Sequence, residues 1–337
     1  MKNVNILFCI FFTAIMSCKE NIVRKNPDAQ DAALTMLASW ADTPRQRIEK
    51  WMKEVTDSTA TSFIPQKDRI AVFDNDGTLW PEQPVPFQAI FAIEHLKILA
   101  PTHPEFQKDP VLKAALNGDL EPLKKAGMQG LMKVVGASHF GMSASDFDNA
   151  VRNWIDTARD AKNNKLYKEN IYLPMVELLG YLRANGFKTF IVSGGGADFM
   201  RVWTEDAYGI PPYQVIGSYG DLKFEVKDGK PVITKTNGEI YVDDKAGKPV
   251  AIRRFIGKVP VFCGGNSDGD QAMMQYTHGS KYRSMNLIVH HTDSIREFKY
   301  DTRTVSGHLE SALAEAKQKD WMVVDMAKDW KKIFTFR

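Results

Sequence analysis

The sequence predicts an α/β fold in which a doubly wound parallel sheet carries a helical insertion after its first strand. Between residues 174 and 325, short apolar runs of strand length alternate with amphipathic helical segments, as expected for parallel strands joined by helices. The apolar run 70–73 leads directly into an acidic loop, and residues 85–180 show helical patterns without a convincing strand. Ligands of such sheets bind at the carboxyl ends of the strands.

Residues 18–66 are predicted to form a tether followed by packing helices. Leu34, Leu37 and Trp40 recur at intervals of three, and Thr43-Pro44 is a suitable helix start. The next apolar residues have the i, i+3, i+4, i+7 spacing of one helix face; they are Ile48, Trp51, Met52 and Val55. We expect this stripe to pack in the core rather than to form a binding surface.

The remaining elements follow in order along the chain. In the insertion, helices are expected at 86–99, 110–116 and 145–161. An amphipathic helix at 174–185 ends at Gly186. After it, strands are expected at 187–193, 259–263, 285–289 and 322–325, and helices at 197–208 and 270–276. The turn Asp228-Gly229 joins 222–226 to 231–235 in a predicted β-hairpin.

The loop after the first strand carries two carboxylates in the sequence Asp74-Asn75-Asp76-Gly77-Thr78. Asp74 can attack phosphorus and form an aspartyl-phosphate if a divalent cation neutralises the phosphate that it approaches. Asp76 lies on the same side of an extended segment, where it can protonate the leaving oxygen and later deprotonate the attacking water. The plain alternative is an acidic turn after a strand, without catalysis.

A second loop offers a phosphate-binding site. Ser193 ends its strand and is followed by Gly194-Gly195-Gly196. The Ser193 hydroxyl and the amides of Gly194 and Gly195 can bind phosphate oxygens, helped by the helix that begins near residue 197. A glycine-rich turn with a structural serine is the alternative interpretation.

The motifs, taken in their order along the chain, resemble those of the haloacid dehalogenase superfamily of phosphatases. Its later motifs are matched by the strand ending in Ser193, a lysine at 245 or 248, and the loop 265–270, which reads Gly-Asn-Ser-Asp-Gly-Asp. The loops are most similar to the phosphoserine phosphatase-like and bacterial acid phosphatase-like branches. The resemblance implies Mg²⁺ as cofactor, a catalytic core of residues 67–84 and 181–337, and a helical cap of residues 85–180 over the active site.

The resemblance also implies a lysine that cancels charge between the nucleophile and the phosphate. Lys248, followed by Pro249, matches the usual context more closely than Lys245 and is the preferred candidate. The fourth motif departs from the pattern, because most relatives carry Asp at the position of Asn266. The implied metal site comprises Asp74, the Asp76 backbone carbonyl and Asn266, with Asp270 positioning the lysine or metal-bound waters and Asp268 as a further candidate. A neutral amide ligand lowers the expected metal affinity unless Asp268 or Asp270 compensates.

Other polar residues near these motifs are interpreted as structural. Glu82 follows the nucleophile loop and can border the substrate cleft. His290 and His291 are adjacent on a predicted strand end, so they point to opposite faces and are not expected to share one metal ion. Cys263 lies in a predicted strand and is expected to be a buried structural thiol.

Residues 1–17 resemble a bacterial lipoprotein signal. An apolar run from Ile6 to Met16 leads to Ser17-Cys18, and Cys18 is expected to carry the lipid after cleavage. An ordinary signal peptide or a short anchor is the alternative. Lys19-Glu20 lacks the Asp that would retain a lipoprotein on the inner membrane. We therefore expect export across the inner membrane, with the protein at the outer membrane or facing the periplasm and held only by its lipid.

The composition sets limits on the function. The net charge of +3 over 337 residues is too small to indicate a nucleic-acid partner. We expect a Mg²⁺-dependent phosphohydrolase that acts on a small phosphorylated metabolite. One alternative is a weak or inactive protein of the same fold that binds a ligand or partner, which only Asn266 favours. A carbon–halogen hydrolase is disfavoured because those relatives lack the second aspartate, here Asp76.

Overall fold

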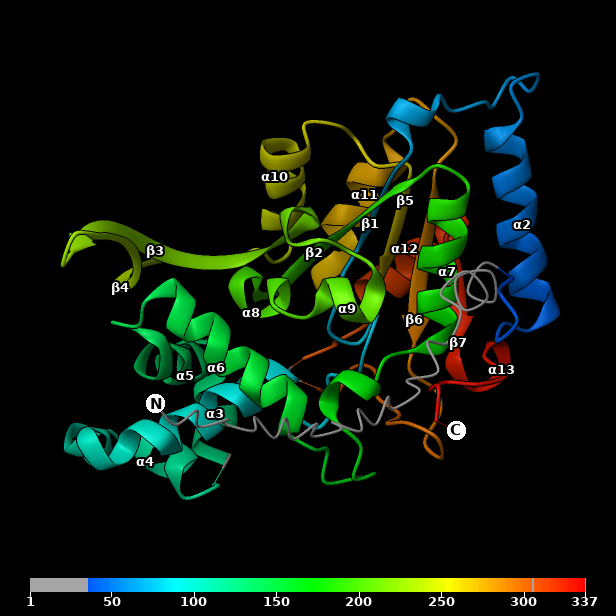
Figure 1. Ribbon diagram of the computed structural model, residues 1–337. Coiled ribbons are helices and arrows are strands. Elements are labelled where there is room, and N and C mark those ends of the chain that lie inside the picture. The colour runs from blue at the N-terminus through cyan, green and yellow to red at the C-terminus, as the bar shows by residue number, and fades with distance from the viewer. Residues whose placement is uncertain (1–35, 120, 305, 337) are drawn as a thin grey trace, which may run out of the picture.

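The computed structural model describes residues 36–119, 121–304 and 306–336, and its centre is a seven-stranded sheet (Figure 1). The spatial order is β4-β3-β2-β1-β5-β6-β7, and all neighbours are parallel except β3 and β4. The strands are β1 (Ile70–Phe73), β2 (Lys188–Gly196), β3 (Val215–Lys227), β4 (Lys230–Tyr241), β5 (Phe262–Gly265), β6 (Met285–His290) and β7 (Met322–Asp325).

The chain winds outward from β1 in two directions, which confirms the predicted doubly wound sheet. It first adds β2 and β3 on one side, and after the hairpin it adds β5, β6 and β7 on the other. β1 therefore pairs with both β2 and β5. This is a topological switch point, where the loops after neighbouring strands leave room for a ligand.

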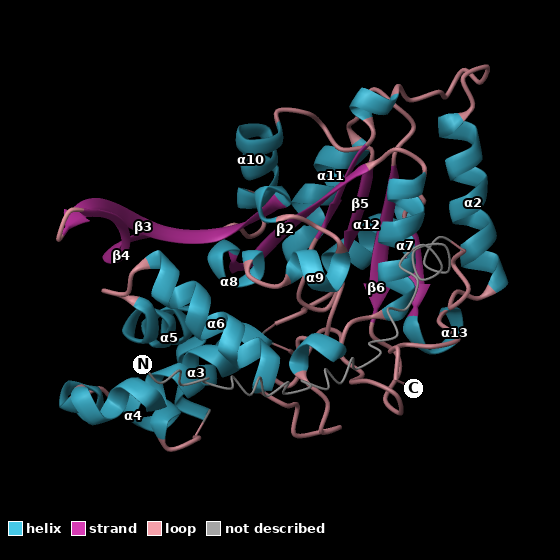
Figure 2. Ribbon diagram, in the orientation of Figure 1, coloured by secondary structure: helices cyan, strands magenta, loops and turns pink. Residues whose placement is uncertain are grey.

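Helices cover both faces of the sheet (Figure 2). In β1, Ala71 and Phe73 pack into the cluster that includes α2 and α7, whereas Ile70 and Val72 pack into the cluster that includes α11 and α12. Burial on both faces explains why β1 is continuously apolar. The helices of the two layers and the sheet edges are α2 (Asp42–Thr56), α7 (Leu173–Ala184), α8 (Ala197–Arg201), α9 (Thr204–Tyr208), α10 (Gly247–Ala251), α11 (Gln271–His278), α12 (Ser311–Lys319) and α13 (Met326–Asp329).

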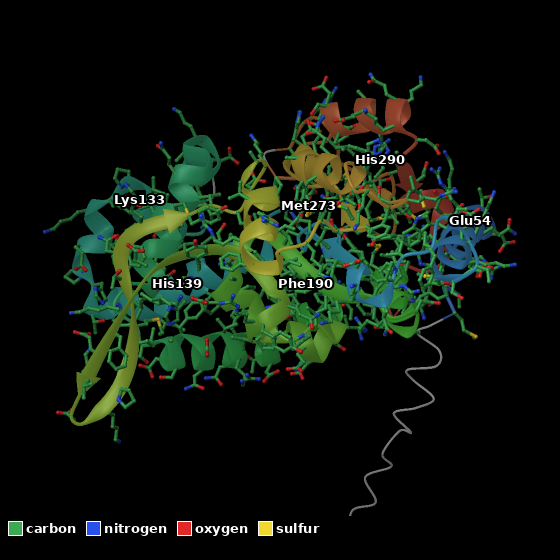
Figure 3. The ribbon with its side chains drawn as sticks, turned by 90° about the horizontal axis from the view of Figure 1, so that it is seen from above. Glu54, Lys133, His139, Phe190, Met273 and His290 are labelled. Carbon is green, nitrogen blue, oxygen red and sulfur yellow. The ribbon has the colours of Figure 1, made fainter. Side chains whose placement is uncertain are left out.

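The insertion after β1 forms a helical unit with its own apolar cluster. Its helices are α3 (Phe87–Leu99), α4 (Pro110–Leu116), α5 (Glu121–His139) and α6 (Ala144–Thr157). Asp109 starts α4 by accepting hydrogen bonds from the amides of Val111 and Leu112. Seen from above, Lys133 and His139 of this unit lie at the opposite end of the molecule from Glu54 and His290 (Figure 3). The cluster contains Ala92, Ile93, Leu96, Phe106, Leu112, Ala115, Leu123 and Val134.

The hairpin of β3 and β4 links the sheet to this helical unit. β3 begins as the parallel partner of β2 and continues beyond the sheet as the hairpin. Backbone bonds of 2.9 Å join Gly141 N to Lys235 O and Lys235 N to Met142 O. The Lys235 ammonium also pairs with Asp198 of α8. The hairpin is longer than the sequence pattern predicted, and it packs on the insertion rather than standing free.

The segment before α2 differs from its prediction, because residues 36–41 do not form a helix. Leu37 has φ +48°, and Trp40 forms a β-bridge with Trp330 near the end of the chain. The two indole rings meet edge to face at 6.0 Å, and Trp40 Nε1 donates to Pro174 O over 2.8 Å. These distant contacts outweigh the helical spacing of the apolar residues.

Two predicted elements are shifted or broken. The strand expected at 259–263 is β5 at Phe262–Gly265; Pro260 has no N–H to give to a ladder, so pairing begins after it. The helix expected at 197–208 is divided into α8 and α9 by Trp203, which leaves helical geometry with φ −134°. Its ring stacks on Trp80 at 4.2 Å, a tertiary contact.

The predicted signal 1–17, Cys18 and the start of the tether lie outside the described residues. In the part of the chain that the structure does describe, no helix combines the length and apolar character needed to cross a bilayer. Cys263 is a buried free thiol, as expected.

Candidate active site

β1 runs directly into the acidic loop 74–78, which is held against β5. The amide of Asp74 donates to Gly264 O over 3.0 Å. Gly77 has φ +75°, and a Cβ there would lie 2.1 Å from Asn266 Nδ2. Glycine is therefore needed both for the backbone conformation and for the close approach of Asn266.

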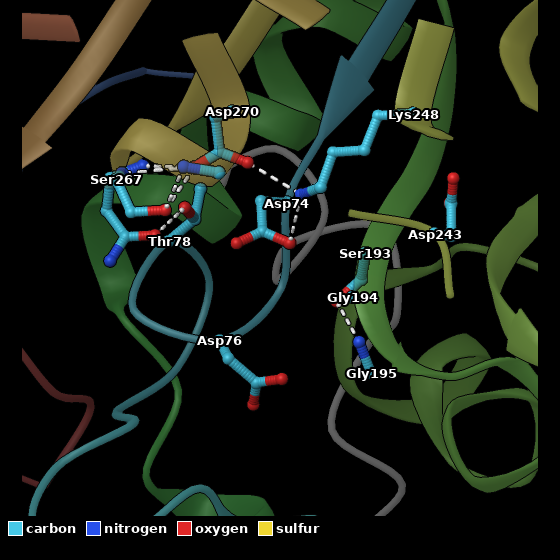
Figure 4. Close-up of polar contacts among 12 residues, drawn as sticks. Asp74, Asp76, Thr78, Ser193, Gly194, Gly195, Asp243, Lys248, Ser267 and Asp270 are labelled. Carbon is cyan, nitrogen blue, oxygen red and sulfur yellow. Dashed lines mark hydrogen bonds and ion pairs between the residues drawn. The ribbon is translucent and has the colours of Figure 1, made fainter. Parts of the chain in front are cut away.

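Lys248 bridges Asp74 and Asp270 at the centre of the site (Figure 4). Its Nζ lies 2.8 Å from Asp74 Oδ1 and 2.6 Å from Asp270 Oδ1. The Lys248 side chain is 2% exposed and that of Asp74 10%. Of the two lysines considered from the sequence, the structure brings only Lys248 to Asp74, because Lys245 is solvent-exposed on the preceding loop.

The charges of this cluster depend on one another. Burial raises the pKa of Asp74 to about 7, and Asp270 adds to the rise while Lys248 opposes it. Burial alone would lower the pKa of Lys248, but the Asp270 and Asp74 carboxylates raise it above its usual range. Lys248 therefore stays protonated and provides a fixed positive charge beside the carboxylate of Asp74.

Asp76 lies across from Asp74 with its carboxylate oriented by Trp80. Trp80 Nε1 donates to Asp76 Oδ1 over 2.6 Å. Burial raises the pKa of Asp76 to about 6, and the Trp80 hydrogen bond opposes the rise. A carboxyl group with a pKa in this range can give and take a proton near neutral pH, which suits acid and base catalysis.

Ser193 and the glycines after it form the end of β2, where the pairing with β3 is irregular, and Gly195 faces Asp76. The Gly195 amide donates to Ser193 Oγ over 3.1 Å, and the Gly196 amide donates to Gln88 Oε1 over 2.7 Å. A Cβ at Gly195 would lie 3.2 Å from Asp76 Oδ2 and 3.4 Å from both Gln88 Oε1 and Ser193 Oγ. Gln88 belongs to α3 of the insertion and was not recognised from the sequence, because one polar residue in a helix carries no signal.

Asn266 is brought to the loop of Asp74 and Asp76, and its side chain is fixed from both ends. Its Oδ1 accepts from Thr78 Oγ1 over 3.1 Å, and its Nδ2 donates to Glu82 Oε1 over 2.6 Å. Glu82 is 3% exposed. Burial raises its pKa to about 8, and the Ser306 and Tyr300 hydroxyls oppose the rise; a nearby bound cation would favour the carboxylate form.

The C-terminal part of the chain supports the same loop. His291 Nε2 lies 2.7 Å from Gly77 O, and its ring stacks on Tyr300 at 4.2 Å. Tyr300 in turn donates to Glu82 over 2.7 Å. His291 is buried beside the loop whereas His290 is not, in keeping with their opposite orientations. Tyr300 and Ser306 were not recognised from the sequence because they follow the last matching motif.

The two aspartates of the fourth motif have different surroundings. Asp270 uses Oδ1 for Lys248 and Oδ2 for the amides of Asn266 and Ser267, at 2.9 and 3.1 Å. Both its oxygens are thus engaged in positioning. Asp268, the further metal candidate from the sequence, has a carboxylate that accepts from the amides of Glu310, Ser311 and Ala312 at the start of α12.

The remaining donors are all oxygen atoms and fit a hard divalent cation such as Mg²⁺. They are the Asp74 carboxylate, the Asp76 backbone carbonyl and Asn266 Oδ1. Among the described residues, no three His, Cys, Asp or Glu side chains are grouped as for a metal ion. A cation here would therefore depend on amide and backbone oxygens as much as on carboxylates.

Comparison with known proteins agrees with this architecture. The haloacid dehalogenase-like hydrolase family matches residues 71–275, more than half of the chain. This range contains Asp74, Ser193, Lys248 and Asp270. No curated protein sequence gives a significant match.

Solved structures are similar to this chain at low sequence identity. A conserved functionally unknown protein from Anaerococcus prevotii DSM 20548 has a TM-score of 0.52 and 15% identity, and the match covers 83% of this chain and 90% of that one. A phosphoserine phosphohydrolase-like protein from Francisella tularensis subsp. tularensis SCHU S4 has a TM-score of 0.38 and 17% identity, over 74% and 98% of the two chains. At such identities the first match shows the fold alone, and the second is too distant to indicate a function.

Proposed function

Because the chain belongs to the haloacid dehalogenase-like hydrolase family, we propose that it is a Mg²⁺-dependent phosphohydrolase that cleaves a small phosphomonoester through an aspartyl-phosphate on Asp74. The observation that carries this proposal is the buried contact of Asp74 with Lys248, at 2.8 Å, beside a second carboxylate at Asp76. Lys248 lowers the cost of bringing a phosphate dianion to an anionic nucleophile.

In the first step, the Asp74 carboxylate forms a bond to phosphorus while the bond from phosphorus to the ester oxygen breaks. Asp76 gives its proton to the departing oxygen. The Ser193 hydroxyl and the amides of Gly194 and Gly195 hold the oxygens that are not transferred. Asp74, the Asp76 carbonyl and Asn266 would hold Mg²⁺, which when bound neutralises phosphate charge.

In the second step, Asp76 takes a proton from water, and the water oxygen attacks phosphorus. The bond between phosphorus and Asp74 breaks, so inorganic phosphate leaves and both carboxyl groups return to their initial states. The Trp80 indole keeps Asp76 in place for both proton transfers.

The test is a screen of small phosphomonoesters with Mg²⁺ and with a chelator, combined with acid quenching and mass spectrometry of the protein. We expect phosphate release only with Mg²⁺, and a transient phosphoryl group on the peptide that contains Asp74. Asp74→Asn should release no phosphate and carry no phosphoryl group, while its circular dichroism spectrum stays that of the wild type. Steady turnover by this variant, with deamidation excluded by mass, would refute the role of Asp74.

The proposed location follows from the signal-like segment. We propose that the mature protein is exported and carries a lipid on Cys18, so that a lipid rather than a protein segment attaches it to the membrane. The substrate would then be a phosphorylated metabolite outside the inner membrane.

A further inference from the structure

The contact between Asn266 and Glu82 determines which end of the amide is available to a ligand. Glu82 Oε1 lies 2.6 Å from Asn266 Nδ2. In its carboxylate form, which a bound cation favours, Glu82 accepts hydrogen bonds but does not donate them, so this contact fixes the nitrogen on the Glu82 side. The oxygen of Asn266 then lies at the Thr78 side, 3.1 Å from Oγ1. Only this oxygen can bind a hard cation.

The position of Glu82 is built into several parts of the chain. Besides Asn266, its carboxylate accepts from Tyr300 over 2.7 Å and from Ser306. Cβ atoms at Gly77 and Gly307 would lie 2.3 and 2.2 Å from Oε1, and both glycines have φ +75°. Two loops distant in sequence thus leave room for one carboxylate behind Asn266.

We propose that Glu82 is a positioning residue that supplies, through Asn266, the negative charge that this amide lacks as a metal ligand. This inference rests on the proposed function. A hydrogen bond to a charged acceptor is stronger than one to a neutral acceptor and polarises the donor amide. Replacing a residue that hydrogen-bonds to a metal ligand commonly lowers the metal affinity by about 10- to 100-fold. The negative charge of the site is therefore supplied by Glu82, which lies behind Asn266, and not by residue 266 itself.

The test is a charge exchange between positions 82 and 266, measured as Mg²⁺ binding by isothermal titration calorimetry on the metal-free full chain. Glu82→Gln keeps the size and an acceptor for Asn266 Nδ2 but removes the charge. We expect it to bind Mg²⁺ about 10- to 100-fold more weakly than the wild type. The double variant Glu82→Gln/Asn266→Asp returns one negative charge to position 266 and should regain most of the affinity.

Glu177→Gln is a matched control, because Glu177 is also buried and accepts from the amide and hydroxyl of Ser39. It should bind Mg²⁺ like the wild type. The inference is overturned if Glu82→Gln has wild-type affinity, or if the double variant binds no more tightly than Glu82→Gln. If Glu82→Gln does not fold by circular dichroism, the double variant decides, and weak binding by the folded double variant counts against the inference. A wild-type chain that binds no Mg²⁺ would instead refute the proposed cofactor, which is a separate result.

Discussion

The amide of Gly196 donates to Oε1 of Gln88 over 2.7 Å, so the helical insertion contacts the glycines at the end of β2 directly. Gln88 is the second residue of α3, and the glycines follow Ser193 at the end of β2. The insertion therefore contributes a polar group within the space between Ser193 and Asp76.

We predict that Gln88→Ala lowers kcat/KM for a phosphomonoester by about 10-fold, the effect of one hydrogen bond of roughly 1.4 kcal/mol. Gln88→Glu should cost more, because its charge opposes Asp76 and the incoming phosphate. Steady-state kinetics with the exposed control Gln275→Ala measure both effects. Wild-type kinetics in both Gln88 variants would show that the contact has no part in the reaction.

Asp76→Asn should lower kcat by about 10²- to 10⁴-fold, the usual contribution of a general acid and base. Asn keeps an oxygen to accept from Trp80, so the fold should be retained. For kcat/KM the loss should be smaller with an aryl phosphate than with an alkyl phosphate, because an aryl oxide leaves without a proton. Equal losses for the two substrates would contradict the assignment of Asp76 as the acid.

Lys248→Met should abolish turnover and destabilise the fold by about 3–5 kcal/mol, because Asp74 and Asp270 then face each other without a cation. Urea unfolding in the presence of a chelator measures the stability. The control is Lys245→Met, which changes an exposed lysine and should alter stability by no more than about 0.5 kcal/mol. A similar small change in Lys248→Met would contradict the predicted coupling of the three charges.

Asp243→Asn should stabilise the protein at neutral pH. Asp243 is fully buried, and neither carboxylate oxygen has a hydrogen-bond partner among the described residues. Burial raises its pKa from 3.8 to about 6, with Lys248 opposing the rise. The folded chain thus holds this proton more tightly than the unfolded chain, so the contribution of Asp243 to stability is present below pH 3.8 and is lost as the pH rises to about 6.

The gain from Asp243→Asn should therefore be about 1–3 kcal/mol above pH 6 and should vanish near pH 4. Thermal unfolding between pH 4 and pH 8 measures it. Asp228→Asn, in the exposed hairpin turn, is the control and should show no such difference. A gain that does not depend on pH would exclude titration of Asp243 as the cause.

Cys18→Ser, with a cleavable signal retained, should move the protein from the membrane fraction to the soluble fraction. The reason is that the lipid on Cys18 is the proposed attachment. Fractionation of bacterial cells, with mass spectrometry of the N-terminal peptide, measures both location and lipid. An unmodified and fully soluble wild-type chain would reject the proposal.

The sequence predicted the sheet well because its signals are local. The apolar run at Ile70–Phe73 is buried on both faces, and such a run leaves few alternatives to a central strand. The loop of Asp74 and Asp76 follows β1, Ser193 lies near the end of β2, and Lys248 precedes β5. Their convergence then follows from the strand order, since the ends of β1, β2 and β5 lie side by side.

The features that escaped prediction depend on contacts between distant residues. Trp40 leaves its helical spacing because Trp330 and Pro174 hold it. The role of Glu82 behind Asn266 was not recognised, because its partners Tyr300 and Ser306 lie more than two hundred positions away. The sequence pattern of Asn266 showed a missing charge, but it could not show which carboxylate lies behind the amide.

The hairpin is attached to two parts of the molecule, the main sheet and the helical unit beside the buried Asp74. The first part of β3 is a strand of the main sheet, and Lys235, near the middle of β4, is joined to the segment before α6. The position of α6 relative to β2 is therefore tied to the position of the hairpin. The helical unit is thus held to the main sheet by the hairpin as well as by the chain that enters and leaves it.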